Sequence, residues 1–431
     1  MSLQSWGRLP TAPQEGVRLA FRGDALPSTD GRSMLPRGLG RSYGDVCLND
    51  QGRLLIARPL DRFIAFDAES GLLCCESGVS LAEILELALP RGWFLPVTPG
   101  TKFVTVGGAI ANDVHGKNHH SVGSFGEYVQ SLELLRSDGT RLACSATGNA
   151  DWFGATIGGL GLTGLIASAE IKLRRVTSAT MDVTTLRFGR LSEFFELSRA
   201  CDATHEYTVA WLDCFARDGN LGRGLFMRAN HADGDVQQLA SERVRDPRIS
   251  VPFPPPISAV NPLTSRAFNA IYYPLSRVGE SRQHYEPYFY PLDGIGEWNR
   301  MYGPRGFYQY QCVVPSPEAI RELLDVVAKS GAASFLNVLK AFGDRSSPGW
   351  LSFPRAGYTL ALDFPNRGPD TLRLFDTLDR IVITAGGALY PAKDARMPGA
   401  LFRQAYPRWH QLERMRDPNF SSNFWRRVTR E

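Results

Sequence analysis

One residue whose type could serve acid–base chemistry is Lys393, in the segment Tyr390-Pro-Ala-Lys-Asp-Ala-Arg396. The chain has only six lysines among its 48 basic residues, so a lysine inside a motif-like segment stands out. A lysine becomes a base when burial or a neighbouring cation lowers its pKa toward neutrality. Lys117, Lys340 and Arg396 are candidate neighbours, although the same cations would also suit a substrate phosphate. The alternative is a surface lysine paired with Asp394, and the pattern favours the functional interpretation.

Three histidines lie between the glycine turns of residues 99–123, namely His115, His119 and His120. His115 and His119 have the i, i+4 spacing that binds a metal on a helix, but Gly116 and Asn118 disfavour a helix here. No helical glutamate completes an HExxH pattern, so no metal site is predicted. A histidine in such a loop more often positions its surroundings by hydrogen bonds than transfers protons.

Polar and aromatic side chains in the second half of the chain are candidates for substrate contacts. Gln309 and Gln311 stand two apart on a β-like segment and are expected on one face of it. Their amides suit sugar hydroxyls, but they would equally satisfy a sheet surface. The aromatic segment 285–290 is either an apolar lip for a lipid tail or part of the core. The segment 424–427, Phe-Trp-Arg-Arg, favours a docked terminal helix over a membrane contact.

Three glycine-rich segments could hold a phosphate-bearing cofactor. Residues 37–45, Arg-Gly-Leu-Gly-Arg-Ser-Tyr-Gly-Asp, form either an anion-binding nest or a plain turn. Residues 99–123 form the second segment. The third segment, 158–164, matches the dinucleotide fingerprint GxGxxG, but it follows a helical stretch and precedes a strand-like one. This order is the reverse of the Rossmann unit, so NAD binding there is rejected.

The helices and strands expected around these segments indicate an α+β protein. Ser80 and Glu83 form a capping box for a helix ending near Leu89, and further helices are expected at 151–156, 317–329 and 370–384. Strands are expected at 54–56, 72–75, 132–135, 171–173, 334–339 and 359–363. The first 30 residues are expected to be loosely ordered, and residues 251–256 to form an extended linker.

Composition narrows the class of protein further. With 431 residues, 43% of them hydrophobic and 21% charged, the chain is globular and long enough for two or three folding units. A net charge of +4 gives no broad basic surface for nucleic acid. No apolar run approaches 18 residues and no signal peptide is recognisable, so a cytoplasmic protein is expected. The seven cysteines lack a CxxC pair and are expected to be free thiols.

The order of the segments RGxGRSYGD, PGTxxVTVGGAIANDVHG and GGLGLTG resembles the FAD-binding domain of the vanillyl-alcohol-oxidase / p-cresol-methylhydroxylase (PCMH) superfamily. The segments 115–125, 308–311, 335–343 and 389–396 further resemble the flavoprotein subunits of decaprenylphosphoryl-β-D-ribose 2′-epimerases. The resemblance implies a PCMH-type FAD-binding domain over residues 1–176 and a second α+β substrate (cap) domain over 177–385. Residues 386–431 would return to the FAD domain and the active site.

Members of that family oxidise the ribose 2′-hydroxyl of a polyprenyl-phosphoryl sugar to a ketone. The resemblance therefore implies FAD, a lipid-linked ribose and an NAD(P)H-dependent short-chain reductase that completes the epimerisation to the arabinose donor for cell-envelope glycans. It also implies work at the inner face of the membrane through a peripheral contact. The alternatives are a soluble sugar, alditol or aldonolactone oxidase using oxygen, and a flavoprotein scaffold for the reductase.

The resemblance also assigns roles by position. FAD would be held by Pro36, Arg37, Gly38, Leu39, Gly40, Arg41, Ser42, Tyr43, Gly44, Asp45, Val46, Pro99, Gly100, Thr101, Thr105, Val106, Gly107, Gly108, Asn112, Asp113, Val114, His115, Ile166 and Tyr390. Lys393, His115 and Tyr43 form the catalytic set. Lys393 would be the base or the cation that steers the sugar hydroxyl, His115 would orient the ring or pocket, and Tyr43 would lie beside the isoalloxazine. Substrate would be bound by Lys117, Gln309, Gln311, Lys340 and Lys393.

Two positions separate this chain from relatives. Arg41 stands where many superfamily members carry the histidine that bonds covalently to flavin, so noncovalent FAD is expected. Ala361 stands where mycobacterial members carry a cysteine, so no thiol at that position takes part in the reaction.

Overall fold

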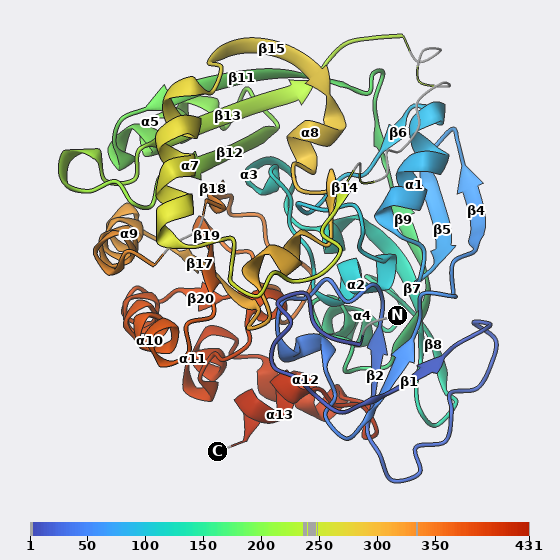
Figure 1. Cartoon of the computed structure of the whole chain (residues 1–431). Coiled ribbons are helices and arrows are strands. Elements are labelled where there is room, and N and C mark those ends of the chain that lie inside the picture. Colours follow the sequence, from blue (N-terminus) through green and yellow to red (C-terminus); the bar gives the residue numbers. More distant parts are fainter. Residues whose placement is uncertain (1–2, 236–238, 240–246, 248, 333–334, 431) are drawn as a thin grey trace.

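The protein is built around a five-stranded and an eight-stranded sheet, seen in a computed structural model that describes residues 3–235, 239, 247, 249–332 and 335–430 (Figure 1). Helices pack against both sheets, and each sheet has its own hydrophobic core. The fold is therefore α+β with two domains, as the sequence predicted.

The five-stranded antiparallel sheet has the order β4-β5-β9-β7-β8. Its strands are β4 (Phe63–Asp67), β5 (Leu72–Glu76), β7 (Val129–Leu135), β8 (Arg141–Ser145) and β9 (Leu165–Lys172). The helices α1 (Leu81–Ala88), α2 (Val106–Ala111) and α4 (Ala150–Thr156) belong to this domain. Ser80 and Glu83 form the predicted capping box of α1, which satisfies backbone N–H groups at its first turn.

A small parallel sheet brings the N-terminal segment into this domain, contrary to the loosely ordered entry expected from its polar composition. It has the order β1-β3-β2 and consists of β1 (Glu15–Arg18), β2 (Met34–Arg37) and β3 (Arg53–Ile56). Trp6 is buried, and its backbone N–H donates to the Ser42 carbonyl over 2.8 Å. The large apolar ring of Trp6 thus fixes a segment whose other residues gave no such signal.

The eight-stranded sheet is antiparallel throughout and has the order β15-β11-β13-β12-β18-β19-β17-β20. Its strands are β11 (Thr180–Phe188), β12 (Tyr207–Leu212), β13 (Gly224–His231), β15 (Gly279–His284), β17 (Phe307–Val314), β18 (Asn337–Phe342), β19 (Gly357–Pro365) and β20 (Ala388–Leu389). The strand expected at 334–339 begins later, at Asn337, and Ser334 lies outside the described residues.

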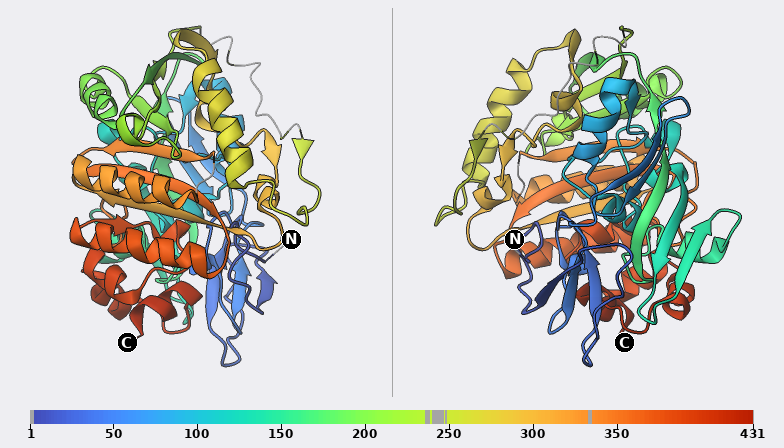
Figure 2. Two further views of the ribbon diagram at one scale, coloured as in Figure 1. Left: turned by 60° about the vertical axis from the view of Figure 1, so that its left-hand side comes forward. Right: turned by 90° about the vertical axis from the view of Figure 1, so that its right-hand side faces the viewer.

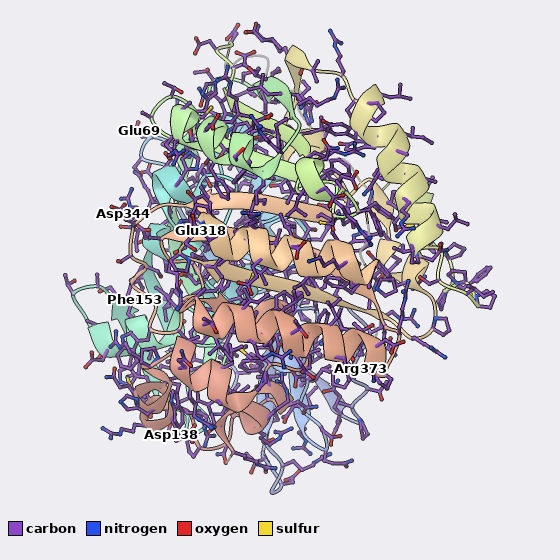
Figure 3. The ribbon with its side chains drawn as sticks, turned by 90° about the vertical axis from the view of Figure 1, so that its left-hand side faces the viewer. Glu69, Asp138, Phe153, Glu318, Asp344 and Arg373 are labelled. Atoms are coloured by element: carbon purple, nitrogen blue, oxygen red, sulfur yellow. The ribbon has the colours of Figure 1, made fainter. Side chains whose placement is uncertain are left out.

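Three helices cover the outer face of this sheet, as Figure 3 shows for the layer that carries Glu318 and Arg373. They are α5 (Leu191–Cys201), α9 (Pro317–Ser330) and α10 (Pro369–Thr384), the last two within one residue of their predicted bounds. Each buries its apolar stripe, for example Ile320, Leu323 and Leu324 of α9. Because the outer face is covered, the inner face is left for the site.

The chain ends in α11 (Gly399–Ala405), α12 (Trp409–Met415) and α13 (Asn423–Thr429), beside the N-terminal strands (Figure 2). Phe424 and Trp425 of α13 are buried, and the Arg427 guanidinium donates to the carboxylates of Asp45 and Asp394. This segment is the docked terminal helix favoured above, and the membrane interpretation of 424–427 is wrong because its aromatic rings lie in the core.

One helix, α7 (Pro262–Leu275), stands on the outside of the molecule in both Figure 1 and Figure 2. The expected linker 251–256 precedes it and follows the short strand β14 (Ile249–Ser250), which pairs with β16 (Ile295–Gly296). All seven cysteines are free thiols, as expected. None of the helices in the described ranges is long and apolar enough to cross a membrane.

Candidate active site

A cavity of about 1070 Å³ lies between the inner face of the eight-stranded sheet and the glycine-rich segments of the other domain. Twenty of the predicted cofactor residues line it: Pro36, Arg37, Gly38, Leu39, Gly40, Arg41, Ser42, Tyr43, Val46, Pro99, Gly100, Thr101, Thr105, Gly107, Gly108, Asn112, Val114, His115, Ile166 and Tyr390. All five predicted substrate residues line the same cavity. Residues more than 350 positions apart in the chain thus meet in one site.

Four predicted cofactor residues do not line the cavity, namely Gly44, Asp45, Val106 and Asp113. The Asp45 carboxylate is turned toward Arg427, and the Asp113 carboxylate accepts hydrogen bonds from the hydroxyls of Ser124 and Ser347. Val106, the first residue of α2, is fully buried in the hydrophobic core. The side chains of Asp45, Val106 and Asp113 thus point away from the cavity, and Gly44 packs against the backbone of Asp394. Motif matching does not separate such residues from the neighbours that face the cavity.

Backbone forms much of the cofactor wall because side chains are excluded from it. A Cβ on Gly38 would lie 2.2 Å from Thr105 Oγ1, and one on Gly107 would lie 2.9 Å from Ser77 Cβ. Gly161, the second glycine of the GxGxxG match, also lines the cavity with a φ of +74°. The segment lies between α4 and β9, so the helix-before-strand order that excluded a Rossmann fingerprint is confirmed.

Alternate residues of three adjacent strands form the floor of the cavity. On β17 these are Gln309 and Gln311, whose cross-strand partners are Asp363 and Ala361 of β19. Thr359 of β19 faces Lys340 of β18 in the same way. The two glutamines therefore share a face, as their spacing predicted, and Ala361 contributes a methyl group to the floor.

Lys393 lies at one end of this floor, with its ammonium 3.7 Å from the centre of the Tyr43 ring. It belongs to a short 3₁₀ turn, Pro391–Lys393, which is tied to the glycine loop because the Tyr43 N–H donates to the Ala392 carbonyl over 2.9 Å. Burial lowers the pKa of Lys393 to about 8, while the nearby Asp363 carboxylate opposes that shift. A fraction of the amine is thus neutral near physiological pH, and the neutral form predominates only above a pH of about 8.

Of the neighbours considered for Lys393, Lys340 is close enough for the charge of Lys393 to lower its pKa, whereas Asp394 and Arg396 have other partners. Asp394 accepts from Arg427 and is not the partner of an exposed Lys393. Arg396 forms a bidentate pair with Asp379. The charged group that acts on Lys393 is instead Asp363. Its carboxylate accepts a hydrogen bond from the Gln309 amide over 2.6 Å, and burial raises the pKa of Asp363 to about 7.

His115 links the loop of residues 99–123 to the floor. Its Nε2 lies 3.0 Å from the Gln311 amide nitrogen, and its Nδ1 lies 3.2 Å from the Lys340 ammonium. Burial and the positive charge of Lys340 hold the pKa of His115 well below its usual range, so the imidazole is neutral. A neutral ring held on both nitrogens is suited to positioning.

A second cationic end of the cavity is formed by Lys117 and Lys340. The Lys117 ammonium donates to the carbonyls of Tyr288 and Phe289, in α8 (Tyr285–Phe289), over 2.8 and 3.1 Å. Burial lowers the pKa of both lysines to about 7, and for Lys340 the charges of Lys117 and Lys393 add to this effect. An anion placed here would restore their charge.

The other histidines point elsewhere. The His119 ring packs on Phe342 at 4.4 Å between centroids, and His120 Nε2 lies 3.0 Å from the His205 carbonyl. Within the described residues no cluster of three or more His, Cys, Asp or Glu side chains is arranged to hold a metal ion.

Buried polar atoms in the cofactor wall fit a polar ligand such as FAD. Arg41 Nε, Ser77 Oγ and Asn112 Oδ1 are buried and have no hydrogen-bond partner among the described residues. The Arg41 guanidinium stacks 4.0 Å above the Trp6 ring, and burial lowers its pKa. Such groups are destabilising unless a ligand satisfies them, and a dinucleotide offers the required donors and acceptors.

Several lining residues escaped the sequence analysis, among them Trp6, Trp211, Tyr272, Trp298 and Asp363. Asp363 had a signal, because it lies two and four residues beyond Ala361 and Thr359 on one predicted strand. The aromatic residues had none, since their spacing shows no pattern and distant elements bring them together.

The comparisons with known proteins match this geometry. A family model described as "FAD binding domain" matches residues 25–145. The chain is 39% identical to "Decaprenylphosphoryl-beta-D-ribose oxidase" of Mycolicibacterium smegmatis, over 99% of this chain and 97% of that protein. The chain belongs to this family of FAD-dependent oxidases. The predicted resemblance and the flavin fold are thereby confirmed.

Two further relatives show how much of the chain is similar to other proteins. An uncharacterised protein of Streptomyces coelicolor is 35% identical over 81% of this chain and 100% of its own length. L-gulonolactone oxidase of Mus musculus is 29% identical, but over only 34% of this chain and 33% of its own length. The likeness to the family thus extends through both domains, whereas that to the lactone oxidase covers about a third of the chain.

Proposed function

We propose that this protein oxidises the 2′-hydroxyl of a polyprenyl-phosphoryl-β-D-ribose to the 2′-keto sugar, with noncovalent FAD as hydride acceptor. The observation that carries the proposal is the placement of Lys393, with a pKa of about 8, at the end of the sheet floor where its ammonium meets the Tyr43 ring of the glycine loop. Residues 1–176 form the FAD domain, 177–385 the substrate domain, and 386–431 return Lys393 to the cavity between them.

Lys393 is the base of the proposed reaction. Bound FAD supplies the acceptor for the hydride that leaves C2′ of the ribose. The neutral Lys393 amine takes the proton of the 2′-hydroxyl, so that the C–O bond becomes a carbonyl. The Tyr43 ring then lies against the ammonium that forms, a cation–π contact that stabilises its charge.

The remaining polar residues hold the sugar and its phosphate. Gln309 and Gln311 present amides to the ribose hydroxyls, and His115 fixes Gln311 in place. Lys117 and Lys340 bind the phosphodiester, which returns their charge and neutralises the cationic end of the cavity. The apolar side chains of Trp211, Met227 and Val338 line a path for the first isoprene units.

Noncovalent FAD follows from Arg41, because a guanidinium cannot form the bond to the flavin ring that histidine forms. The epimerisation further requires a reductant that delivers hydride to the opposite face of the ketone. An NAD(P)H-dependent short-chain reductase is the proposed partner, acting in the cytoplasm at the inner face of the membrane that holds the lipid substrate.

A soluble sugar, alditol or aldonolactone oxidase is the alternative. It is disfavoured because the match to a lactone oxidase covers about a third of the chain, and because two buried lysines beside the sugar floor suit an anionic substrate. A scaffold without turnover is disfavoured by the environment of Lys393.

The proposal is tested by the absorption spectrum of the purified protein. Acid precipitation should release all of the flavin into the supernatant. Anaerobic addition of a short-chain polyprenyl-phosphoryl ribose should bleach the flavin bands of the intact protein, while its 2-deoxyribosyl analogue, which lacks the reacting hydroxyl, should not. Flavin retained in the precipitate contradicts noncovalent binding, and a protein that stays yellow with the ribosyl lipid contradicts the substrate.

A further inference from the structure

The segment 249–278 exposes apolar side chains to an unusual extent. Eight of the twelve large hydrophobic side chains that are exposed in the described part of the chain fall within it. Among them are Ile249 (65% exposed), Phe253 (68%), Ile257 (80%), Leu263 (78%), Ile271 (60%) and Leu275 (77%). Scattered exposed hydrophobic residues are ordinary, but a concentration of this kind marks an interaction surface, here named the 249–278 surface.

Helix α7 carries this surface with its polarity inverted. Leu263, Ile271 and Leu275 recur at multiples of four residues and so share one face, which is exposed. The residues that α7 buries are Ser265 and Asn269, and the Asn269 amide donates to the Asp213 carboxylate over 2.7 Å. A helix that buries a serine and an asparagine while it exposes Leu263, Ile271 and Leu275 is expected to have a partner of low polarity on its outer face.

The charge of the 249–278 surface has one sign. No aspartate or glutamate occurs between Ile249 and Val278, whereas Arg266 and Arg277 are both exposed. Apolar side chains flanked by arginines match the acyl region and the anionic headgroups of a bilayer.

The surface is continuous with the active-site cavity. Phe268 and Tyr272 of α7 and the following Arg277 line the cavity, and Phe268 and Arg277 are exposed. The other exposed lining residues include Arg282 of β15 and the prolines Pro287 and Pro291. These exposed lining residues place an opening of the cavity beside α7, and Figure 1 shows that α7 is followed directly by β15 at the top of the molecule.

We propose that the 249–278 surface docks on an anionic lipid bilayer, with Leu263, Ile271 and Leu275 inserted among the acyl chains and the cavity mouth at the headgroup level. The surface deepens the proposed function, on which this part of the inference rests, because it lets the phosphoryl sugar enter while the polyprenyl tail stays in lipid. Docking itself depends only on the exposed side chains and their charge.

The test is flotation of the FAD-loaded protein with phosphatidylcholine vesicles, with and without phosphatidylglycerol. The wild-type protein should float with the anionic vesicles. The triple variant L263S/I271S/L275S should lose binding on the order of a hundredfold, because three inserted apolar side chains are removed. The matched control F21S/L372S, which alters exposed apolar residues outside the surface, should float like the wild type. R266Q should weaken binding to the anionic vesicles about fivefold, and the matched control R321Q should not.

A second measurement separates this inference from the proposed activity. The triple variant should still be reduced by the soluble short-chain ribosyl lipid at the wild-type rate, because none of its three positions lines the cavity. Wild-type protein that is reduced by this lipid but does not float would overturn the docking surface and leave the activity intact. Floating protein that the lipid does not reduce would overturn the activity and support the docking surface.

The occupant of the surface is tested in the same preparations by light scattering without vesicles. A monomer that floats supports the bilayer. A wild-type dimer that the triple variant converts to monomer, with no flotation of either, would show that a second copy of the chain covers α7 and would overturn the inference.

Discussion

Lys393 is the residue whose replacement separates catalysis from binding most directly. Removal of its amine leaves the 2′-hydroxyl proton without an acceptor, so K393A should reduce the rate of flavin reduction by about 10²- to 10⁴-fold. Anaerobic stopped-flow absorbance at the flavin bands measures this rate, and K329A, an exposed lysine of α9, is the matched control. Reduction of K393A at the wild-type rate would remove Lys393 from the reaction.

The environment of Lys393 also predicts a pH dependence. The base must be neutral, and the folded protein holds the pKa of Lys393 at about 8, lowered by burial from 10.5. The rate of flavin reduction should therefore rise with pH through about 8 and then level off. A rate that falls over this interval would indicate that Lys393 acts as a cation.

Asp363 is a positioning residue, and the pH dependence of the rate of flavin reduction tests its role. Its carboxylate favours the ammonium form of Lys393, so it holds the pKa of the lysine higher than burial alone would. D363N keeps a polar partner for the Gln309 amide but removes the negative charge. The rising limb of the pH profile should then shift to lower pH. A purely structural role would lower the rate without moving the limb.

At the scale of elements, docking of α13 depends on Arg427. The guanidinium donates to Asp45 in the glycine loop and to Asp394 next to Lys393, so one side chain ties the chain end to both walls of the site. R427A leaves two buried carboxylates without their cation and should lower the free energy of unfolding by about 3–5 kcal/mol. Urea unfolding measures this, with R430A at the exposed chain end as control.

The pH dependence of that loss follows from the Asp45 carboxyl group. Burial already raises the pKa of Asp45 while Arg427 opposes the shift. Without the guanidinium the pKa of Asp45 rises further. A carboxyl group whose pKa is higher in the folded than in the unfolded chain makes the folded protein less stable as the pH increases. The R427A variant should thus be relatively more stable in acid than near neutral pH, and an equal loss at both would contradict the assignment.

Elements with strong local signals were predictable from the sequence. Helices α1, α9 and α10 have N-terminal caps or prolines and apolar stripes, and their predicted bounds agree with the structure to within one or two residues. The N-terminal segment was not, because Trp6 is held by contacts with Arg41 and residues 42–43 that no local pattern encodes. The exposed apolar face of helix α7 was also not predictable, because the sequence does not show which face of the helix is buried.

At the scale of the whole molecule, the candidate site is a product of long-range assembly. The glycine segments and Lys393 were found because family motifs mark them, and most of them line one cavity. Asp363 was missed because its place in the site depends on the register of β17 with β19. Trp6 and Trp298 were missed because segments far apart in the chain bring them together. Motifs identify the residues that contact the reacting groups more readily than the residues that orient them.

Because the cavity lies between the two domains, FAD should couple their stabilities. Bound FAD would supply hydrogen-bond partners to Arg41, Ser77 and Asn112, whose buried polar atoms lack partners among the described residues. It binds the folded chain and not the unfolded one, so a hundredfold excess of FAD over its Kd should add about 2.7 kcal/mol to the free energy of unfolding.

Protein stripped of FAD should therefore melt at a lower temperature than the holoprotein, and added FAD should restore the higher Tm. Differential scanning calorimetry measures both, with riboflavin, which lacks the pyrophosphate and adenosine, as the matched control. Equal melting temperatures with and without FAD would show that the glycine-rich wall does not hold the cofactor.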